Sequence, residues 1–278
     1  MRNTFLILLL MAGGSIPAQA QLRDFSIAWN GWELKSDAKF SGTVHTVLTT
    51  EQRDDRVFGT WTDVYDRMGK RISNLYQSAA IEIHSNSLIR LGNKTTYQYG
   101  LHGRLESGTG FSLEGNPDRR YTLTYDSQGR LTESAAYDGG KIARRTLYIH
   151  SPERRELEIR NTFHLDGREV PSEKTVLIYN SNNQWVRRIT YKKDGSVNAT
   201  IDYEYNTKGN LIKEVHCCEY NYTHQYEYKY DRRGNWIERQ DIYSYTDGSG
   251  EKIVDRNWMY TYRVITYFDE ETNASARK

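Results

Sequence analysis

Polar residues alternate with ring-bearing or apolar residues along much of the chain, which is the two-residue period of a β-strand. The segment Tyr222-Thr223-His224-Gln225-Tyr226-Glu227-Tyr228-Lys229-Tyr230 carries a ring at every second position. Successive side chains of a strand point to opposite faces of its sheet, so one face of this strand is aromatic and the other is polar and charged. The pattern predicts an all-β chain.

A short motif recurs between these alternating segments. In its first three copies it runs from an aromatic residue through two or three mostly polar residues to a glycine and a basic residue, and in two of them on to a leucine; the three later copies carry Gln or Asn in the basic position. The starting tyrosines 99, 125, 179, 205 and 230 recur about every 26 residues, and one degenerate copy near residues 148–157 fills the single double step. The copies span residues 65–70, 99–105, 125–131, 179–185, 205–211 and 230–236.

The motif has the composition of a hairpin turn. Asp or Asn at its second position accepts hydrogen bonds from the backbone two residues on, and glycine tolerates the positive φ that such a turn requires. The tyrosine before the turn and the Leu or Trp after it then face each other across two strands. A second class of reversal lies between these motifs and contains Asp-Gly, a strong hairpin signal. It occurs at residues 137–140, 165–168 and 193–196.

One period of about 26 residues therefore accommodates two strands of about nine residues and two turns. Repeated along the chain, this gives on the order of 14 strands, more than an open twisted sheet usually holds without curling. We expect an antiparallel meander of tandem hairpin repeats, curled into an open sheet or partial barrel with its tyrosine face inward. Residues 21–278 are predicted to form a single domain.

The first 20 residues have the order of a secretory signal. Arg2 precedes an apolar run at residues 5–12, and Pro17-Ala18-Gln19-Ala20 supplies an Ala-x-Ala cleavage site. No later apolar stretch reaches the length of about 20 residues that a membrane-spanning helix needs, so no transmembrane segment is expected in the mature chain. We expect an exported protein that resides in the periplasm or outside the cell.

The charge balance bears on the partners. The chain has 38 Lys and Arg against 36 Asp and Glu, for a net charge of +2, and no long block of one sign. Nucleic acid is therefore not the expected partner. The 22 Tyr, 7 Phe and 6 Trp supply the large side chains from which a core can be built.

At Tyr125-Asp126-Ser127-Gln128-Gly129-Arg130-Leu131 the motif resembles that of bacterial YD-repeat proteins, also called RHS-repeat proteins. The copies cover residues from about 60 to 240. In large members of that family the resemblance implies a β-shell of hairpins that encloses a toxic C-terminal domain. This chain is far shorter, and its polar end at residues 269–278 leaves no room for such a domain. The resemblance therefore implies a small secreted member without a toxin domain, and it transfers no catalytic residue.

The two cysteines, Cys217 and Cys218, are adjacent and would meet an oxidising compartment after export. Three interpretations remain open. The pair forms a vicinal disulfide or a functional thiol pair, the two residues are structural on opposite sheet faces, or one of them binds a metal with His216, His224 and a carboxylate. We expect no metal and no cofactor, because the spacing matches no usual metal motif.

No catalytic motif is recognised, so no catalytic residue is assigned and we do not expect an enzyme. Flat aromatic faces can stack on sugar rings or on peptide side chains, which makes the tryptophans candidates for ligand binding. The candidates are Trp61, Trp185, Trp236 and Trp258. The leading hypothesis is a binding or scaffold protein for an envelope or extracellular protein or glycan. A carbohydrate-active hydrolase and an immunity or inhibitor protein for a toxin are the alternatives.

Overall fold

The computed structural model describes residues 40–78, 81–83, 87–89, 92–112, 114–165, 168–217 and 221–269. Within these residues the chain is all-β, as the alternating pattern predicts. The expected signal peptide, residues 1–20, lies outside the described residues. The described part contains no helix that is both long and apolar enough to cross a membrane.

The strands are β1 (Val44–Arg53), β2 (Arg56–Tyr65), β3 (Arg71–Ser78), β4 (Ile81–Ile83), β5 (Ser87–Ile89), β6 (Gly92–Tyr99), β7 (Leu105–Phe111), β8 (Pro117–Tyr125), β9 (Leu131–Asp138), β10 (Lys141–Ser151), β11 (Glu156–Leu165), β12 (Arg168–Tyr179), β13 (Trp185–Tyr191), β14 (Val197–Tyr205), β15 (Leu211–Cys217), β16 (Tyr222–Tyr230), β17 (Trp236–Thr246) and β18 (Lys252–Tyr267).

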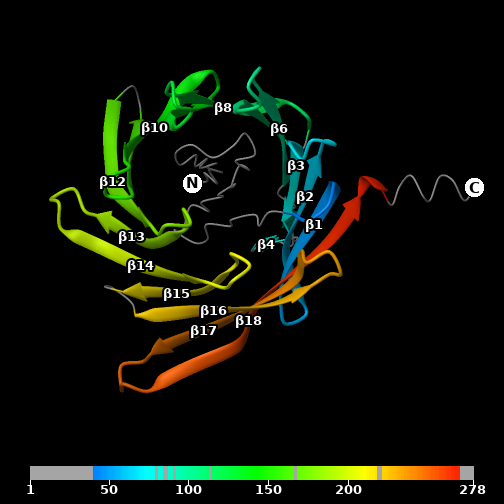
Figure 1. Ribbon diagram of the computed structural model, residues 1–278, viewed down its shortest axis with the longest axis vertical. Coiled ribbons are helices and arrows are strands. Elements are labelled where there is room, and N and C mark those ends of the chain that lie inside the picture. The colour runs from blue at the N-terminus through cyan, green and yellow to red at the C-terminus, as the bar shows by residue number, and fades with distance from the viewer. Residues whose placement is uncertain are drawn as a thin grey trace, which may run out of the picture.

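Sixteen of these strands form one antiparallel sheet that closes into a barrel, while β4 and β5 form a separate hairpin between β3 and β6. Apart from the β3–β6 pair and the β1–β18 pair, neighbours in the sheet are consecutive in the chain, which confirms the predicted meander. The prediction of an open sheet or partial barrel is wrong, because β1 pairs with β2 along one edge and with β18 along the other. In Figure 1 the strands form a ring in which the blue β1 lies beside the red end of β18.

The repeated turns have the hydrogen bonds that the motif predicts. Asp126 Oδ1 accepts the backbone N–H groups of Gln128 and Arg130, each at 2.9 Å. Gly129 adopts a φ of 82°, in the left-handed region that favours glycine. Asp66, Asn180, Asn206 and Asp231 accept the corresponding pair of N–H groups in their own turns. A short amide or carboxylate side chain thus fixes each of these five reversals locally, while the turn after Tyr99 has Gly100 at this position.

The pairing across these turns is also as predicted, with one addition. Tyr125 lies opposite Leu131, but Thr124 lies opposite Glu133, so Thr132 has no partner and forms a β-bulge. The same register shift occurs at the pairs formed by Tyr65, Tyr99, Tyr179, Tyr205 and Tyr230. Each bulge bends and twists its strand pair. We attribute the closure of the barrel to this repeated bending together with the β1–β18 pairing.

The most deeply buried side chains gather on one face of the sheet. Leu105, Leu131, Leu157 and Leu177, which are only 1–2% exposed, form a continuous cluster with tyrosines and Trp185. Apart from the short β4–β5 hairpin, every described strand belongs to the barrel wall itself, so we attribute the burial of these leucines to crowding by neighbouring side chains. Side chains converge on the concave face of a curved sheet and diverge on the convex face. We therefore assign this cluster to the inner face.

Tyrosine hydroxyls connect successive hairpins. Tyr99 donates to the carbonyl of Arg71 at 2.9 Å, and Tyr125 donates to the carbonyl of Leu105 at 2.7 Å. In the degenerate copy, His150 Nε2 takes this place and lies 2.7 Å from the carbonyl oxygen of Leu131. Each of these side chains thereby connects its own turn to the first residue of the strand that follows the preceding turn.

The opposite, outer face carries exposed charges in cross-strand ion pairs. Arg187 pairs with Asp202 at 2.5 Å between β13 and β14, and Lys213 pairs with Glu204 at 2.7 Å between β14 and β15. Similar pairs occur along β9 to β12 and between β16 and β17. Such exposed pairs add little stability.

Candidate functional site: a polar aromatic cluster on β15 to β18

Five rings contact one another on neighbouring strands, and we call them the polar aromatic cluster. They are His216, Tyr222, His224, Tyr243 and Trp258. His216 stacks on its cross-strand partner Tyr222 with ring centroids 4.1 Å apart, and His224 lies 5.2 Å from its partner Tyr243. Tyr243 in turn stacks on Trp258 at 4.7 Å. The rings form one continuous aromatic surface across four strands.

Two histidine–carboxylate pairs are part of this surface. His224 Nδ1 lies 2.8 Å from Asp241 Oδ1, and the two side chains are only 5% and 3% exposed. His216 Nε2 lies 3.0 Å from Glu214 Oε2. A polar group buried at this depth costs folding free energy unless it is hydrogen-bonded, and each pair supplies that bond. The pairs also orient the imidazole rings within the cluster.

Another bulge, in β18, brings Trp258 to the cluster. Asp241 lies opposite Met259 and Tyr243 lies opposite Asp255, so residues 256–258 of β18 all face Ile242 alone. Bulges of this kind change the direction of a side chain. The Arg53 guanidinium lies 4.3 Å from the centroid of the Trp258 ring and pairs with Asp255 at 3.3 Å. A residue from β1 therefore borders the cluster, because the barrel is closed.

The tyrosine hydroxyls remain protonated throughout the physiological range. Burial, followed by the nearby Glu214 carboxylate, raises the pKa of Tyr222 to about 12. Burial also raises the pKa of Tyr243, with a smaller contribution from Tyr245. Both hydroxyls can thus donate and accept hydrogen bonds, but neither is poised as a nucleophile. Ring faces beside hydroxyl, imidazole and carboxylate groups suit recognition of a polyhydroxylated ring.

The structure separates the tryptophan candidates. Trp185 and Trp236 are buried, at 4% and 7% exposure, and belong to the barrel's packing. Trp61 is half-buried with its ring centroid 5.1 Å from that of Tyr76, remote in sequence from the cluster. Trp258 alone among the four lies in the polar aromatic cluster.

The cysteine predictions stay open. Cys217 is exposed at the end of β15, and its Sγ lies 2.8 Å from Thr200 Oγ1. Cys218 lies outside the described residues, so a disulfide to it is not tested. Among the residues that are described, no three His, Cys, Asp or Glu side chains are placed to hold a metal ion. His216 and His224 instead pair with different carboxylates.

Sequence patterns alone did not reveal the cluster, although one signal was available. The ring-bearing positions of β16 share one face, so His224 was expected beside Tyr222 and Tyr226. Their neighbours depend on the registers of β15, β17 and β18. The registers place Glu214 opposite His224, and Tyr226 opposite Asp241.

No family model and no curated protein matches this chain. Among solved structures, a porin-like protein from Bacteroides uniformis is 15% identical with a TM-score of 0.44, over 82% of this chain and 99% of that protein. A porin-like protein from Bacteroides vulgatus is 11% identical with a TM-score of 0.41, over 80% and 98%. The crystal structure of TcdB2-TccC3-TEV is 12% identical with a TM-score of 0.28, over 74% and 18%. Matches at these levels identify neither a family nor a function.

Proposed function

We propose that this chain is an extracytoplasmic binding protein, built from YD-type hairpin repeats, that binds a glycan at the polar aromatic cluster. The observation that carries the proposal is the continuous ring surface of Tyr222, Tyr243 and Trp258 beside one buried and one partly buried histidine–carboxylate pair. Aromatic faces stack on the apolar C–H faces of sugars, and buried polar groups at fixed positions provide the hydrogen bonds that select among them.

The charged outer face favours an aqueous setting for this barrel. In a barrel that spans a membrane, the outer face carries an apolar band, and each Lys or Arg near the bilayer centre costs about 2–4 kcal/mol. Here Arg187 is 51% exposed and Lys229 is 72% exposed on outward positions of β13 and β16. Together with the signal-like sequence at residues 1–20, this supports export to the periplasm or the exterior.

The repeated turns support membership in the YD-repeat family as a part of the proposal. In that interpretation the hairpins are a scaffold, and the variable side chains between the turns determine what is bound. The cluster lies between turns, on β15 to β18, whereas the motif residues Asp126, Gly129 and their equivalents serve the reversals. Scaffold and binding surface are thus carried by different positions of each repeat.

The purified mature chain should bind members of a glycan array without turning them over. The ligand that binds best is then titrated by calorimetry into the wild type, Tyr243→Ala and Tyr262→Ala. Tyr262 is the matched control, because it lies on the outer face of β18 and stacks on Tyr260. We expect Tyr243→Ala to weaken binding at least about 10-fold, which is about 1.4 kcal/mol, and Tyr262→Ala to leave it unchanged. Equal affinities in all three proteins would contradict the proposal, and turnover would favour the hydrolase.

A further inference from the structure

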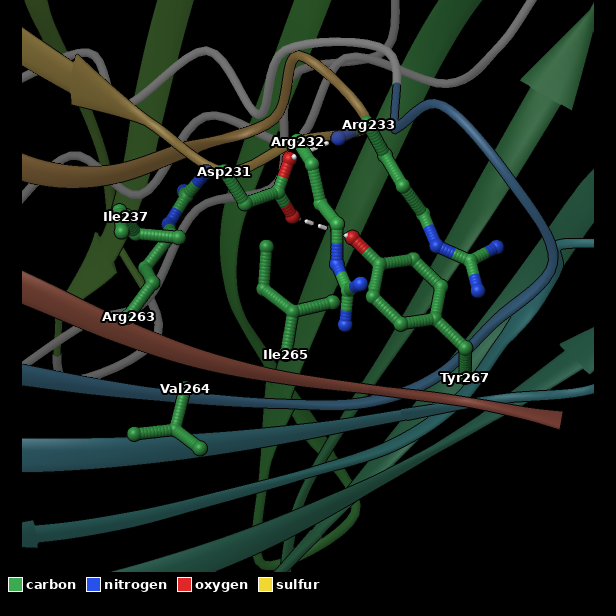
Figure 2. A pocket seen from close by; sticks show the side chains of 8 residues that line it. All are labelled: Asp231, Arg232, Arg233, Ile237, Arg263, Val264, Ile265 and Tyr267. Carbon is green, nitrogen blue, oxygen red and sulfur yellow. Dashed lines mark hydrogen bonds between the residues drawn. The ribbon is translucent and has the colours of Figure 1, made fainter. Parts of the chain in front are cut away.

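A small pocket lies where the turn between β16 and β17 folds over the end of β18. Its volume is about 280 Å³. Figure 2 shows Arg232 reaching from the turn toward β18, while Arg263, Ile265 and Tyr267 reach from β18 toward the turn. Val264 points to the other side of β18. The pocket is separate from the polar aromatic cluster, which lies toward the opposite ends of β16 and β17.

Existing hydrogen bonds occupy the one carboxylate of the lining. Asp231 Oδ2 accepts the Tyr267 hydroxyl at 2.6 Å, and Oδ1 accepts the backbone N–H groups of Arg233 and Asn235, each at 2.9 Å. Burial favours the protonated acid, but these hydrogen bonds outweigh it, so the pKa of Asp231 lies below its ordinary value. Burial and the Asp231 hydrogen bond raise the pKa of Tyr267 to about 12. Asp231 is therefore a charged structural acceptor at neutral pH.

The three arginines of the lining differ in their partners. Arg233 pairs with Asp269 at 2.8 Å and covers the Tyr267 ring at 4.0 Å. Arg263 is buried, and its guanidinium carbon lies 3.5 Å from the centroid of the Trp236 ring. Arg232 is exposed, and its side chain enters the pocket beside Ile265 in Figure 2. Three cations against Asp231 give the lining an excess of positive charge.

Apolar side chains complete the pocket. Ile265 lies between the guanidinium groups of Arg232 and Arg263 in Figure 2, and Ile237 of β17 lines the pocket beside Arg263. A volume of about 280 Å³ is near the lower end of small-molecule sites. Guanidinium groups bind carboxylate and phosphate through paired, charge-assisted hydrogen bonds. The chemistry and the size thus select a compact anion with an apolar surface.

We propose that this pocket binds the carboxylate or phosphate group of a small organic anion of about monosaccharide size. Arg232 and Arg263 flank the anionic group, and Ile237 and Ile265 contact the carbon skeleton. This site does not depend on glycan binding at the polar aromatic cluster, and either site can fail its test without the other.

The test uses three probes of matched ring structure in calorimetric titrations of the full mature chain at low salt. Glucose 6-phosphate supplies a phosphate, glucuronate supplies a carboxylate, and glucose supplies neither. We expect one or both anions to bind, with affinity that falls as salt is added, and glucose to bind at least about 10-fold more weakly. If only glucose 6-phosphate or only glucuronate binds, the result identifies whether the pocket recognises phosphate or carboxylate. Absence of binding by both anions, or equal binding of glucose, overturns the proposal.

Two substitutions locate the site. Arg232→Gln changes an exposed side chain and should weaken binding of the anion about 10-fold without altering the fold. Arg256→Gln, at an exposed position on the same strand as Arg263 but outside the pocket, is the matched control and should bind as the wild type does. Arg263 contacts the ring of Trp236. Quenching of Trp236 fluorescence when the anion is added therefore gives an independent measurement of binding. Equal weakening by both substitutions, or unchanged binding in Arg232→Gln, overturns the assignment.

Discussion

His224 contacts Asp241 diagonally across the β16–β17 pair, with imidazole Nδ1 2.8 Å from the carboxylate Oδ1 and both side chains almost fully buried. Removal of the carboxylate would leave the imidazole N–H without its acceptor, at a cost of about 1–3 kcal/mol. We expect Asp241→Ala to lower the free energy of unfolding by that amount in urea denaturation. Asp202→Ala, which breaks the exposed pair with Arg187, should cost under about 1 kcal/mol. A loss for Asp241→Ala no larger than that for Asp202→Ala would contradict a stabilising role of the buried pair.

Leu131, which follows the Asp126 turn, packs on the inner face of the barrel. Leu131 is 1% exposed, so Leu131→Ala should destabilise the protein by about 2–5 kcal/mol through lost burial and an unfilled cavity. Leu147, 40% exposed on the outer face, provides the matched control, and Leu147→Ala should cost under about 1 kcal/mol. Chemical denaturation of both variants measures the difference. Similar losses of unfolding free energy in both variants would contradict the assignment of Leu131 to the packed inner face and Leu147 to the exposed outer face.

Glycine is required at the turn for its backbone conformation rather than for space. Gly234 has a φ of 83°, and a Cβ built there would meet no atom within 4 Å. Gly234→Ala should therefore cost about 1–2 kcal/mol from the left-handed conformation alone. Gly110 lies inside β7, and a Cβ there makes only ordinary contacts at 3.6 Å or more. Thermal unfolding should show no loss for Gly110→Ala, and a loss as large as that of Gly234→Ala would contradict the explanation.

Two aspartates in turns, Asp194 and Asp247, should make the stability of the fold depend on pH in the acidic range. The Ser196 hydroxyl and backbone N–H lower the pKa of Asp194, and the Ser249 hydroxyl, with backbone N–H groups, lowers that of Asp247. A carboxyl with a lower pKa in the folded state stabilises above its unfolded pKa of about 3.9, and this stabilisation is lost as the pH falls through the folded value. The melting temperature should therefore decrease as the pH is lowered below about 4. Asp194→Asn with Asp247→Asn should flatten that fall, and an unchanged profile would contradict it.

The local features of the fold follow from the sequence because they depend on neighbouring residues. The Asp126 turn, the Tyr125–Leu131 pair and the Gly129 conformation each lie within one motif. Closure does not follow, because it joins segments without an intervening turn. The Thr46 N–H, for example, donates to Thr266 Oγ1 at 3.2 Å across 220 positions.

The same distinction applies to the candidate site. Alternation placed His224 and Tyr222 on one face of a strand, but the approach of Trp258 depends on a bulge in β18, and that of Arg53 depends on closure. Four tryptophans were therefore equivalent candidates in the sequence. In the structure Trp185 and Trp236 are buried, Trp61 lies against Tyr76, and Trp258 stacks on Tyr243.

Ring signals of the histidines test the central claim most directly. With the best glycan ligand at saturation and the pH held constant, the imidazole NMR signals of His216 and His224 are predicted to shift. Those of His102, in the exposed turn after β6, and His164, on β11, should stay in place. Shifts confined to His102 or His164, or no shift at all in His216 and His224, would contradict a glycan site at the polar aromatic cluster.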